Sequence, residues 1–473
     1  MYLGLYQPAD VIEEKGEGYF IPSHPRPLLT PPGFVQILLG ARHSLIGNWL
    51  EDYYRSCVDS FRILGRQVIL INSPDQVKYV MVTRHTNFER KSPQMRRALE
   101  MLLGDGLFIS DSETWKKRRP LVADIVHKRR LPEFAGVMVE GAQATIARWA
   151  ELPSQTEFEL TAEMAHLTAQ IISRAIFGKH LGAEALRHVT EGFTDYQKAV
   201  DSFNLGYFLG ADEGWPLRRS PRRREAVARV HQVIDNVIEA HLKGEGDAKS
   251  MVSLLIYRKA RGGDSDLDVT ALRNEAATIF MAGHETTATT LTWAFYLLAN
   301  APWAERRLLH EIESVCGHRP VTMEDVQHLD WCRSVILETL RLYPPVPLLP
   351  RQAREADRIA DVDVEPGSLV IIAPWLLQRA RDLWENPNHF KPERFANGAK
   401  YNPFAFIPFS VGPRICAGLN FGLDESILCL AALMQRFRVT PRPGYRVEPL
   451  CRLTLRPNGG LPVTVTPRSG AYP

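Results

Sequence analysis

The sequence predicts a mainly α-helical protein that also contains small β-sheets. From about residue 132 to residue 313, apolar residues recur at the period of about 3.6 that marks one buried face of a helix. Short runs rich in Val, Ile and Leu, bounded by Gly, Pro or Asn, occur on both sides of this stretch and favour strands. The chain has 473 residues, of which 45% are hydrophobic and 23% charged, so it can bury a large core.

The elements follow one another in a simple order. The segment of about residues 1–60 is rich in Pro and then amphipathic over residues 34–54. Residues 68–72 predict a short strand after a Gly-Arg turn, and a second element is expected near residues 76–82. Among the helical patterns, the one over residues 271–300 is the longest.

Two further β signals lie in the C-terminal part. Residues 362–372 favour a strand, a turn and a second strand. Residues 452–465 favour a hairpin with Asn458-Gly459 at its turn. We find no Gly/Ser-rich linker, low-complexity tract or internal repeat in the sequence. We therefore expect one domain over residues 1–473, with the Pro-rich segment packed onto it.

Composition excludes several classes of protein. The net charge is only +3, from 57 Lys and Arg against 54 Asp and Glu, which argues against a dedicated nucleic-acid binder. The six cysteines form no C-x-x-C pair, which argues against zinc and iron–sulfur sites and favours reduced thiols in the cytoplasm. The N-terminus lacks the pattern of a signal peptide, and no window approaches 18 apolar residues, so we expect no transmembrane anchor.

The segment from Phe409 to Gly418, Phe-Ser-Val-Gly-Pro-Arg-Ile-Cys-Ala-Gly, is suited to presenting one sulfur to a cofactor. Gly412 and Gly418 bracket Cys416 and allow a tight turn close to a flat, bulky group. Arg414 offers a fixed positive charge for a carboxylate. The apolar residues 419–437 predict a helix that begins just after the cysteine, where backbone N–H groups favour a thiolate. The alternative is a structural cysteine buried in a Gly-rich turn.

A second unusual segment, Ala282-Gly283-His284-Glu285-Thr286-Thr287, lies within the longest predicted helix. Gly283 permits close approach of a planar ring. A Thr hydroxyl can bond back to the carbonyl one turn earlier, and Glu285 beside Thr286 places an acid next to an alcohol, as proton delivery requires. The alternative is the polar face of a solvated helix, and for His284 a purely structural role stays open.

Together these segments resemble the cytochrome P450 family, specifically its soluble, bacterial-type members, which have no membrane anchor. The resemblance implies that family's fold, with the long central helix over a haem, and one catalytic domain. It implies haem b (iron protoporphyrin IX), with Cys416 as the axial thiolate ligand of the iron. Phe409 and Gly418 would lie against the haem beside the sulfur, and Ala282 and Gly283 would lie on the opposite face. Glu285 and Thr286 would deliver protons during oxygen activation.

Further residues match the family's patterns. Glu338 and Arg341, three positions apart on one helix face, and Arg394 in Pro-Glu-Arg-Phe resemble its structural Glu–Arg–Arg network. Trp115 and Arg119, with Arg351 and Arg414, resemble the cradle for the haem propionates. Where the family usually has His-Arg, this chain has Gln378-Arg379. By family position, the substrate pocket would be lined by apolar residues and one Thr: Leu107, Phe108, Ile109, Met281, Ala282, Val346, Leu348, Leu349, Leu453 and Thr454.

The function implied by the resemblance is that of a haem-thiolate monooxygenase. It would insert one oxygen atom from O₂ into a hydrophobic substrate such as a fatty acid, a terpenoid or a similar lipophile. We expect no fused reductase, so electrons would come from a separate ferredoxin or flavodoxin-type donor with its own reductase. That donor would dock near Lys116, Lys117 and Arg118, taken as outward-facing.

Two alternatives stay open: a haem-thiolate peroxygenase or isomerase, and a non-catalytic haem-binding protein. The basic run from Arg218 to Arg224 predicts a solvated loop, with contact to a membrane surface or an anionic substrate as the alternative.

Overall fold

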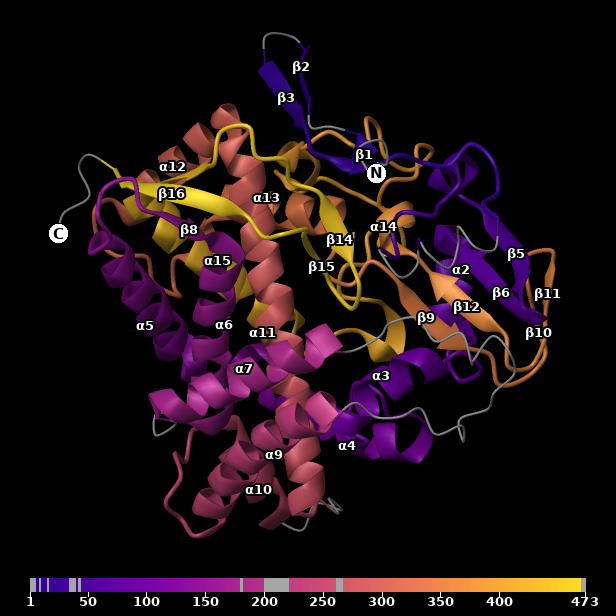
Figure 1. The fold of residues 1–473 in the computed structure, drawn as a ribbon, viewed down its shortest axis with the longest axis horizontal. Coiled ribbons are helices and arrows are strands. Elements are labelled where there is room, and N and C mark those ends of the chain that lie inside the picture. Colours follow the sequence, from indigo (N-terminus) through magenta and orange to yellow (C-terminus); the bar gives the residue numbers. More distant parts are fainter. Residues whose placement is uncertain are drawn as a thin grey trace.

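The computed structural model describes residues 6–7, 10–14, 17–33, 40, 44–178, 182–199, 221–260 and 267–468. Helices make up most of the described chain (Figure 1). They are α2 (Pro74–Lys78), α3 (Pro93–Leu103), α4 (Ser112–Ile125), α5 (Leu131–Ala150), α6 (Leu160–Phe177), α7 (Ala183–Ala199), α9 (Pro221–Leu242), α10 (Met251–Ala260), α11 (Val269–Ala299), α12 (Pro302–Cys316), α13 (Asp330–Leu342), α14 (Pro374–Leu377) and α15 (Leu419–Arg436).

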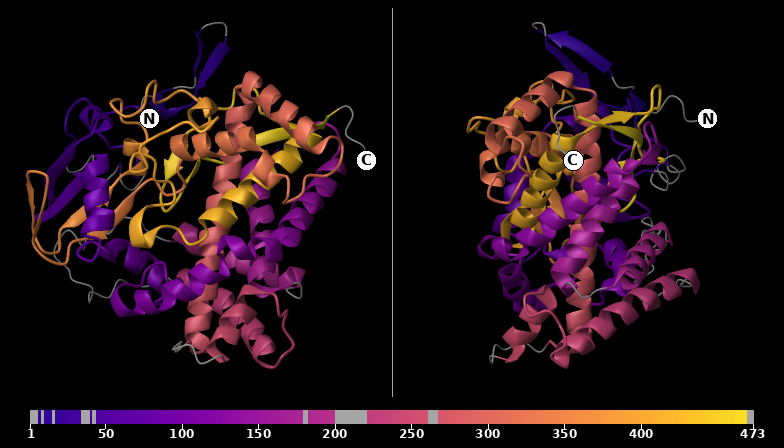
Figure 2. Two further views of the ribbon diagram at one scale, coloured as in Figure 1. Left: turned by 180° about the vertical axis from the view of Figure 1, so that it is seen from behind. Right: turned by 90° about the vertical axis from the view of Figure 1, so that its left-hand side faces the viewer.

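Helix α11 runs through the middle of the molecule and confirms the long helix expected at residues 271–300 (Figures 1 and 2). The side chain of Asp268 caps its start by accepting a hydrogen bond of 2.7 Å from the N–H of Ala271. The helix is buried along most of its length and packs against α6, α9, α13 and α15. A helix that is apolar on nearly every face needs such an all-round coat of neighbours.

The largest sheet lies on the opposite side of α11 from α5 and α6 (Figure 1). Its strand order is β5-β6-β12-β9-β7, and only the β6–β12 pair is parallel. The hairpin of β5 and β6 turns at Leu64 and Gly65, both with positive φ, which is the geometry that a tight hairpin requires. The strands are β5 (Val58–Ile63), β6 (Arg66–Ile71), β7 (Arg90–Lys91), β9 (Leu349–Gln352) and β12 (Leu369–Ile372).

Strand β6 confirms the strand expected at residues 68–72. The expected pair within residues 362–372 is also present, but its two strands lie in different sheets. Strand β11 (Val362–Val364) pairs with β10 (Asp357–Ile359), whereas β12 joins the large sheet. At the N-terminus, β1 (Tyr6–Gln7) pairs with β4 (His24–Pro25), and β2 (Asp10–Glu14) pairs with β3 (Glu17–Ile21).

The hairpin predicted with Asn458-Gly459 at its turn is wrong. Strand β15 (Leu455–Pro457) forms an antiparallel hairpin with the preceding strand β14 (Pro449–Cys451), so the hairpin turn lies at residues 452–454. Strand β16 (Pro462–Pro467) pairs instead with β13 (Phe437–Pro441) and β8 (Glu157–Glu159). Gly459 and Gly460 both have positive φ and carry the chain from one sheet to the other.

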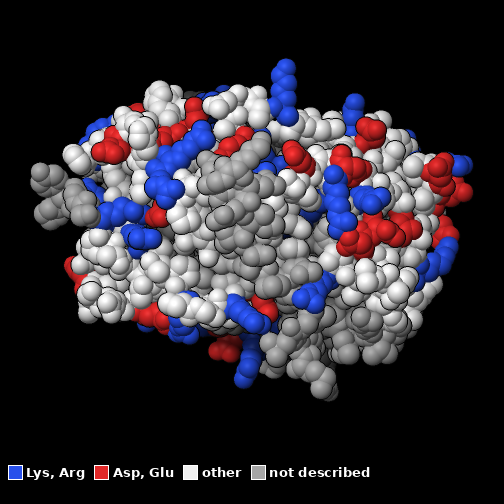
Figure 3. Space-filling model, turned by 90° about the horizontal axis from the view of Figure 1, so that it is seen from above, with Lys and Arg blue, Asp and Glu red and all other residues white. Residues whose placement is uncertain are grey.

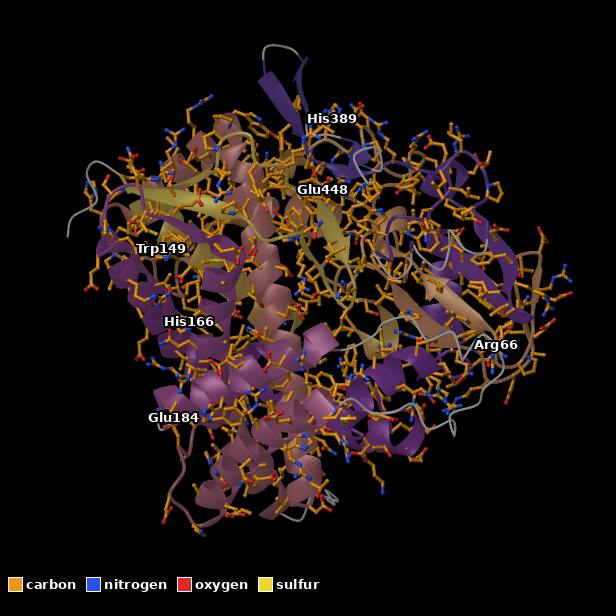
Figure 4. The ribbon with its side chains drawn as sticks, viewed as in Figure 1. Arg66, Trp149, His166, Glu184, His389 and Glu448 are labelled. Atoms are coloured by element: carbon orange, nitrogen blue, oxygen red, sulfur yellow. The ribbon has the colours of Figure 1, made fainter. Side chains whose placement is uncertain are left out.

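Packing joins this second sheet to the helices. The ring of Trp149, labelled in Figure 4, lies 5.4 Å from the ring of Phe158 and 5.6 Å from that of Phe437, between centroids. It thereby ties α5 to strands β8 and β13. Within the described residues, none of the helices has the length and apolar character needed to cross a bilayer.

Candidate active site

One internal cavity collects most of the side chains that the sequence singles out. It lies between α11 and the loop that precedes α15, with α4 and the turn of the β14–β15 hairpin closing its sides. The predicted residues on its wall are Leu107, Phe108, Trp115, Arg119, Met281, Ala282, Gly283, Glu285, Thr286, Val346, Leu349, Arg351, Phe409, Arg414, Cys416, Gly418, Leu453 and Thr454.

The loop before α15 holds Cys416 by backbone contacts. The N–H of Cys416 donates to the carbonyl of Phe409 at 2.8 Å, and the N–H of Ile415 donates to that of Gly412 at 3.0 Å. Gly412 has a φ of 74°, and a Cβ there would lie 2.1 Å from the carbonyl oxygen of Met81. Only glycine therefore fits at this position. Gly418 has a φ of −88°, and a Cβ there would meet no atom within 4 Å, so this glycine leaves open space at the cavity wall.

The surroundings of Cys416 act on its thiol in both directions. Cys416 is exposed toward the cavity, yet protein surrounds it on its other sides. Desolvation by this surrounding protein raises the pKa of Cys416, while the N–H of Gly418 and the guanidinium of Arg119 lower it. Among the described residues, no group of three His, Cys, Asp or Glu side chains is placed to hold a metal ion.

On the facing wall, α11 presents an acid and an alcohol. The Thr286 hydroxyl donates to the carbonyl of Ala282 at 2.6 Å, as expected for a Thr that bonds back by one turn. The carboxylate of Glu285 accepts a hydrogen bond of 2.5 Å from the hydroxyl of Thr454. Thr454 was expected only as a pocket residue, and the structure shows that it also anchors this carboxylate from the β14–β15 turn.

Two other residues of the segment serve helix packing. His284 is buried against α6, its ring centroid is 5.4 Å from that of Phe280, and burial lowers its pKa to about 4. It does not line the cavity among the described residues, so its structural role is favoured. A Cβ at Gly283 would lie 2.9 Å from Cδ1 of Ile172, so glycine lets α11 approach α6 here without a shift of that side chain.

Four cations line the cavity near Cys416: Lys91, Arg119, Arg351 and Arg414. Lys91 was missed by the sequence analysis. It lies on β7 directly opposite Arg351 on β9, and both side chains are buried. Burial, and then the neighbouring Arg351 and Arg414, hold the pKa of Lys91 well below its usual range. Burial, followed by Arg414, lowers the pKa of Arg351 to about 9.

Within the described residues, neither Lys91 nor Arg351 forms an ion pair. Arg414 has a distant one, with 3.5 Å between its guanidinium and Glu89, and its guanidinium carbon lies 4.5 Å from the ring centroid of Trp115. Buried cations without nearby carboxylates are costly unless an anion joins them. The residues present therefore fit a flat group that carries carboxylates at one edge and is bound by a sulfur, as haem would be.

Three expectations need correction. Ile109 and Leu348 do not line the cavity among the described residues. Ile109 is buried in the main core. Leu348 is partly buried against that same core, whereas Leu349 belongs to a second apolar cluster. Arg118 does not face outward: its side chain is 12% exposed and pairs with Asp105 and Glu275.

The Glu–Arg–Arg network is present in the structure. Nε and Nη2 of Arg341 donate to Glu338 at 2.7 and 2.8 Å, and both side chains are fully buried. Nε of Arg394 lies 3.5 Å from the same carboxylate. Gln378 is also satisfied: its amide nitrogen donates to the carbonyls of Leu340 and Arg341, and its oxygen accepts from the N–H of Ile407.

The basic run from Arg218 is described only from residue 221 onward. There it forms the exposed first turn of α9, so the loop prediction is wrong for these residues. Proline at the first helical position is compatible with this start. Residues 218–220 lie outside the described part of the chain.

Comparisons with known proteins identify the family and the fold. The sequence model of the family described as Cytochrome P450 matches residues 25–462. A cyclooctatin synthase from Streptomyces melanosporofaciens is 31% identical over 404 residues, which are 83% of this chain and 85% of that protein. A cytokinin hydroxylase from Arabidopsis thaliana is 28% identical over 82% of this chain and 76% of its own. The crystal structure of the cytochrome P450DA heme domain superposes with a TM-score of 0.78 at 22% identity, covering 93% of this chain and 97% of that one.

Proposed function

Because the chain belongs to the cytochrome P450 family, whose members are haem proteins that use O₂ and electrons from a partner, we propose that it is a haem b monooxygenase acting on a hydrophobic substrate. Residues 1–473 would form its single catalytic domain. The observation that carries this proposal is that Cys416, the buried cations Lys91, Arg351 and Arg414, and the pair Glu285 and Thr286 all line one cavity. A sulfur, a cationic edge and a proton-delivery pair are the three provisions that such an enzyme needs.

The residues divide the work among themselves. When bound, the haem supplies the oxidising chemistry. Cys416 would hold the iron, and the cations, together with Arg119 and the indole N–H of Trp115, would hold the propionates. Thr286 would position a proton at its hydroxyl, and the adjacent Glu285 on the same helix, fixed by Thr454, would pass protons toward it.

The apolar walls of the cavity support a lipophilic substrate. The apolar lining residues include Leu107, Phe108, Met281, Val346, Leu349 and Leu453. Walls of this kind favour apolar ligands and leave orientation to a few polar groups. The relatives are named for different molecules, so their names support the reaction class without selecting a substrate. A fatty acid, a terpenoid or a similar lipophile fits the cavity's chemistry.

We assign electron supply to a separate ferredoxin or flavodoxin-type protein with its reductase. Lys116 and Lys117 are exposed on α4, the helix whose Trp115 and Arg119 line the cavity, so they offer a positive surface near the haem edge. On the face drawn in Figure 3, Lys and Arg are interspersed with Asp and Glu. Together with the small net charge, this mixed pattern among the described residues of that face does not favour nucleic-acid binding.

The proposal is tested by measuring NADH consumption with a ferredoxin, its reductase and dissolved O₂, with and without fatty acids and terpenoids. We expect some of these lipophiles to shift the haem Soret band and to accelerate NADH use in proportion to product. Product formation from hydrogen peroxide alone, with no response to the electron donor, would indicate a peroxygenase instead. A haem spectrum that no lipophile shifts, without turnover, would favour a non-catalytic haem protein.

A further inference from the structure

The loop between α3 and α4 lies directly on α11. Gly104 has a φ of 54°, and a Cβ there would lie 2.2 Å from the side-chain amide of Asn274. A Cβ at Gly106 would lie 2.2 Å from the hydroxyl of Thr278. The two glycines therefore let the loop backbone touch the helix, and Leu107 and Phe108, which follow them, enter the cavity wall.

A buried carboxylate of α11 holds this loop by its backbone. Glu275 is fully buried, and its two oxygens lie 3.1 and 3.2 Å from the N–H of Leu107. Glu275 lies ten positions before Glu285 on the same helix, away from the proton-delivery pair. It is therefore a buried ionisable group for which the proposed chemistry has no use.

Arg118 connects the same carboxylate to the loop a second time. Its Nη1 donates to Glu275 at 3.1 Å, and also to the backbone carbonyl and the carboxylate of Asp105, at 2.7 and 2.8 Å. Its Nη2 donates to the other Asp105 oxygen at 2.9 Å, and the Asn274 amide donates to Asp105 at 2.9 Å. One guanidinium thus ties α4, the loop and α11 together.

We propose that Glu275 is a positioning residue that fixes Leu107 and Phe108 over the cavity and thereby determines which substrates fit. The inference deepens, and rests on, the proposed function. A carboxylate that accepts a backbone N–H of the pocket loop itself sets the height of the adjoining side chains above α11. Burial raises the pKa of Glu275 to about 7, with the nearby Arg118 as the main opposing influence. Burying a carboxylate is unfavourable, and here the buried carboxylate holds the loop that carries Leu107 and Phe108.

The test compares Glu275→Ala, Glu275→Gln and, as a matched control, Asp235→Asn in the haem-loaded protein. Asp235 on α9 pairs at 2.7 Å with Arg273, two positions before Glu275 on α11. The control therefore removes an ion pair from the same stretch of helix without touching the loop. Hydrogen exchange of a peptide containing Leu107 measures directly how well the N–H of Leu107 is held by Glu275. Soret titrations with imidazole and 1-dodecylimidazole measure how the shape of the pocket affects ligand affinity.

We expect Glu275→Ala to speed exchange at Leu107 by roughly tenfold to a hundredfold, as loss of a bond to a charged group implies. It should change the affinity for 1-dodecylimidazole about tenfold while leaving imidazole within about twofold, since only the long ligand reaches the loop. Glu275→Gln keeps an acceptor for the N–H and should restore most of both properties. Asp235→Asn should match the wild type.

Two results would overturn the inference. Normal exchange and normal azole selectivity in Glu275→Ala would show that the loop is held by other contacts. Equal effects in Asp235→Asn would show that any disturbance of α11 moves the pocket. If even the wild type bound neither azole at its haem, the proposed function itself would be wrong. That result differs from one in which the wild type binds both azoles and only the role of Glu275 is wrong.

Discussion

Replacing Lys91 by Met tests the hypothesis that Lys91, Arg351 and Arg414 bind the haem propionates. In the protein alone, the Lys91 ammonium is buried beside Arg351 and Arg414, and these neighbours repel it. A bound dianion would reverse that relation, because the ammonium would then make a charge-assisted hydrogen bond. The substitution should therefore weaken haem binding and at the same time raise the free energy of unfolding of the haem-free protein.

The expected magnitude of both effects follows from the burial of Lys91, which is only 8% exposed. A hydrogen bond to a charged group contributes about 1.5–3 kcal/mol, which corresponds to a roughly 10- to 100-fold loss of haem affinity. The pKa of Lys91 is lowered in the fold, so above that pKa the unfolded chain binds more protons. Stability of the haem-free protein should therefore rise with pH from the lowered pKa up to about 10.5. Lys91→Met should lose that rise.

The assay is haem transfer to an excess of a haem-free globin, followed at the Soret band, with urea unfolding of the haem-free protein at several pH values. Lys243→Met is the matched control, because Lys243 is an exposed lysine just beyond α9. The reasoning is refuted if Lys91→Met keeps haem as long as this control does. It is also refuted if the two haem-free variants share the same pH dependence of stability.

Three more outcomes are expected. Thr286→Ala should keep haem and substrate but send electrons to peroxide and water, lowering product formed per NADH on the order of a hundredfold; unchanged coupling would remove Thr286 from proton delivery. Reversing charge at Lys116 and Lys117 should slow reduction by an acidic partner, as should salt, while dithionite reduces the haem normally; insensitivity to both would place docking elsewhere. Glu338→Gln should cost about 3–5 kcal/mol of unfolding free energy, because it leaves Arg341 buried without its charge partner; a denaturation midpoint equal to the wild type would contradict this.

Local patterns in the sequence predicted the central parts of the fold and the site. The long apolar helix at α11 and the glycine-flanked cysteine before α15 depend on short-range periodicity and turn chemistry, which a sequence displays directly. The Asn458-Gly459 hairpin failed for the opposite reason. That dipeptide favours a tight turn, but β15 and β16 find their partners in other sheets, and pairing between distant strands decides the outcome.

Long-range pairing also explains which site residues were missed or misplaced. Lys91 stands in a charged run that looks solvated, and only its register opposite Arg351 makes it a cavity residue. Arg118 stands in the run Trp-Lys-Lys-Arg-Arg, where its neighbours Lys116 and Lys117 are exposed. Its partner Glu275 is 157 residues away in the sequence, so no local pattern could have predicted that Arg118 points inward.

The central claim, that Cys416 is the thiolate ligand of a haem iron, is tested most directly by the absorption spectrum of the reduced protein with carbon monoxide. We expect the wild type to show the long-wavelength Soret band that marks a thiolate opposite the carbon monoxide, and Cys416→His to lack it. A wild-type spectrum of the kind given by a histidine-ligated globin, unchanged in Cys416→His, would contradict the claim.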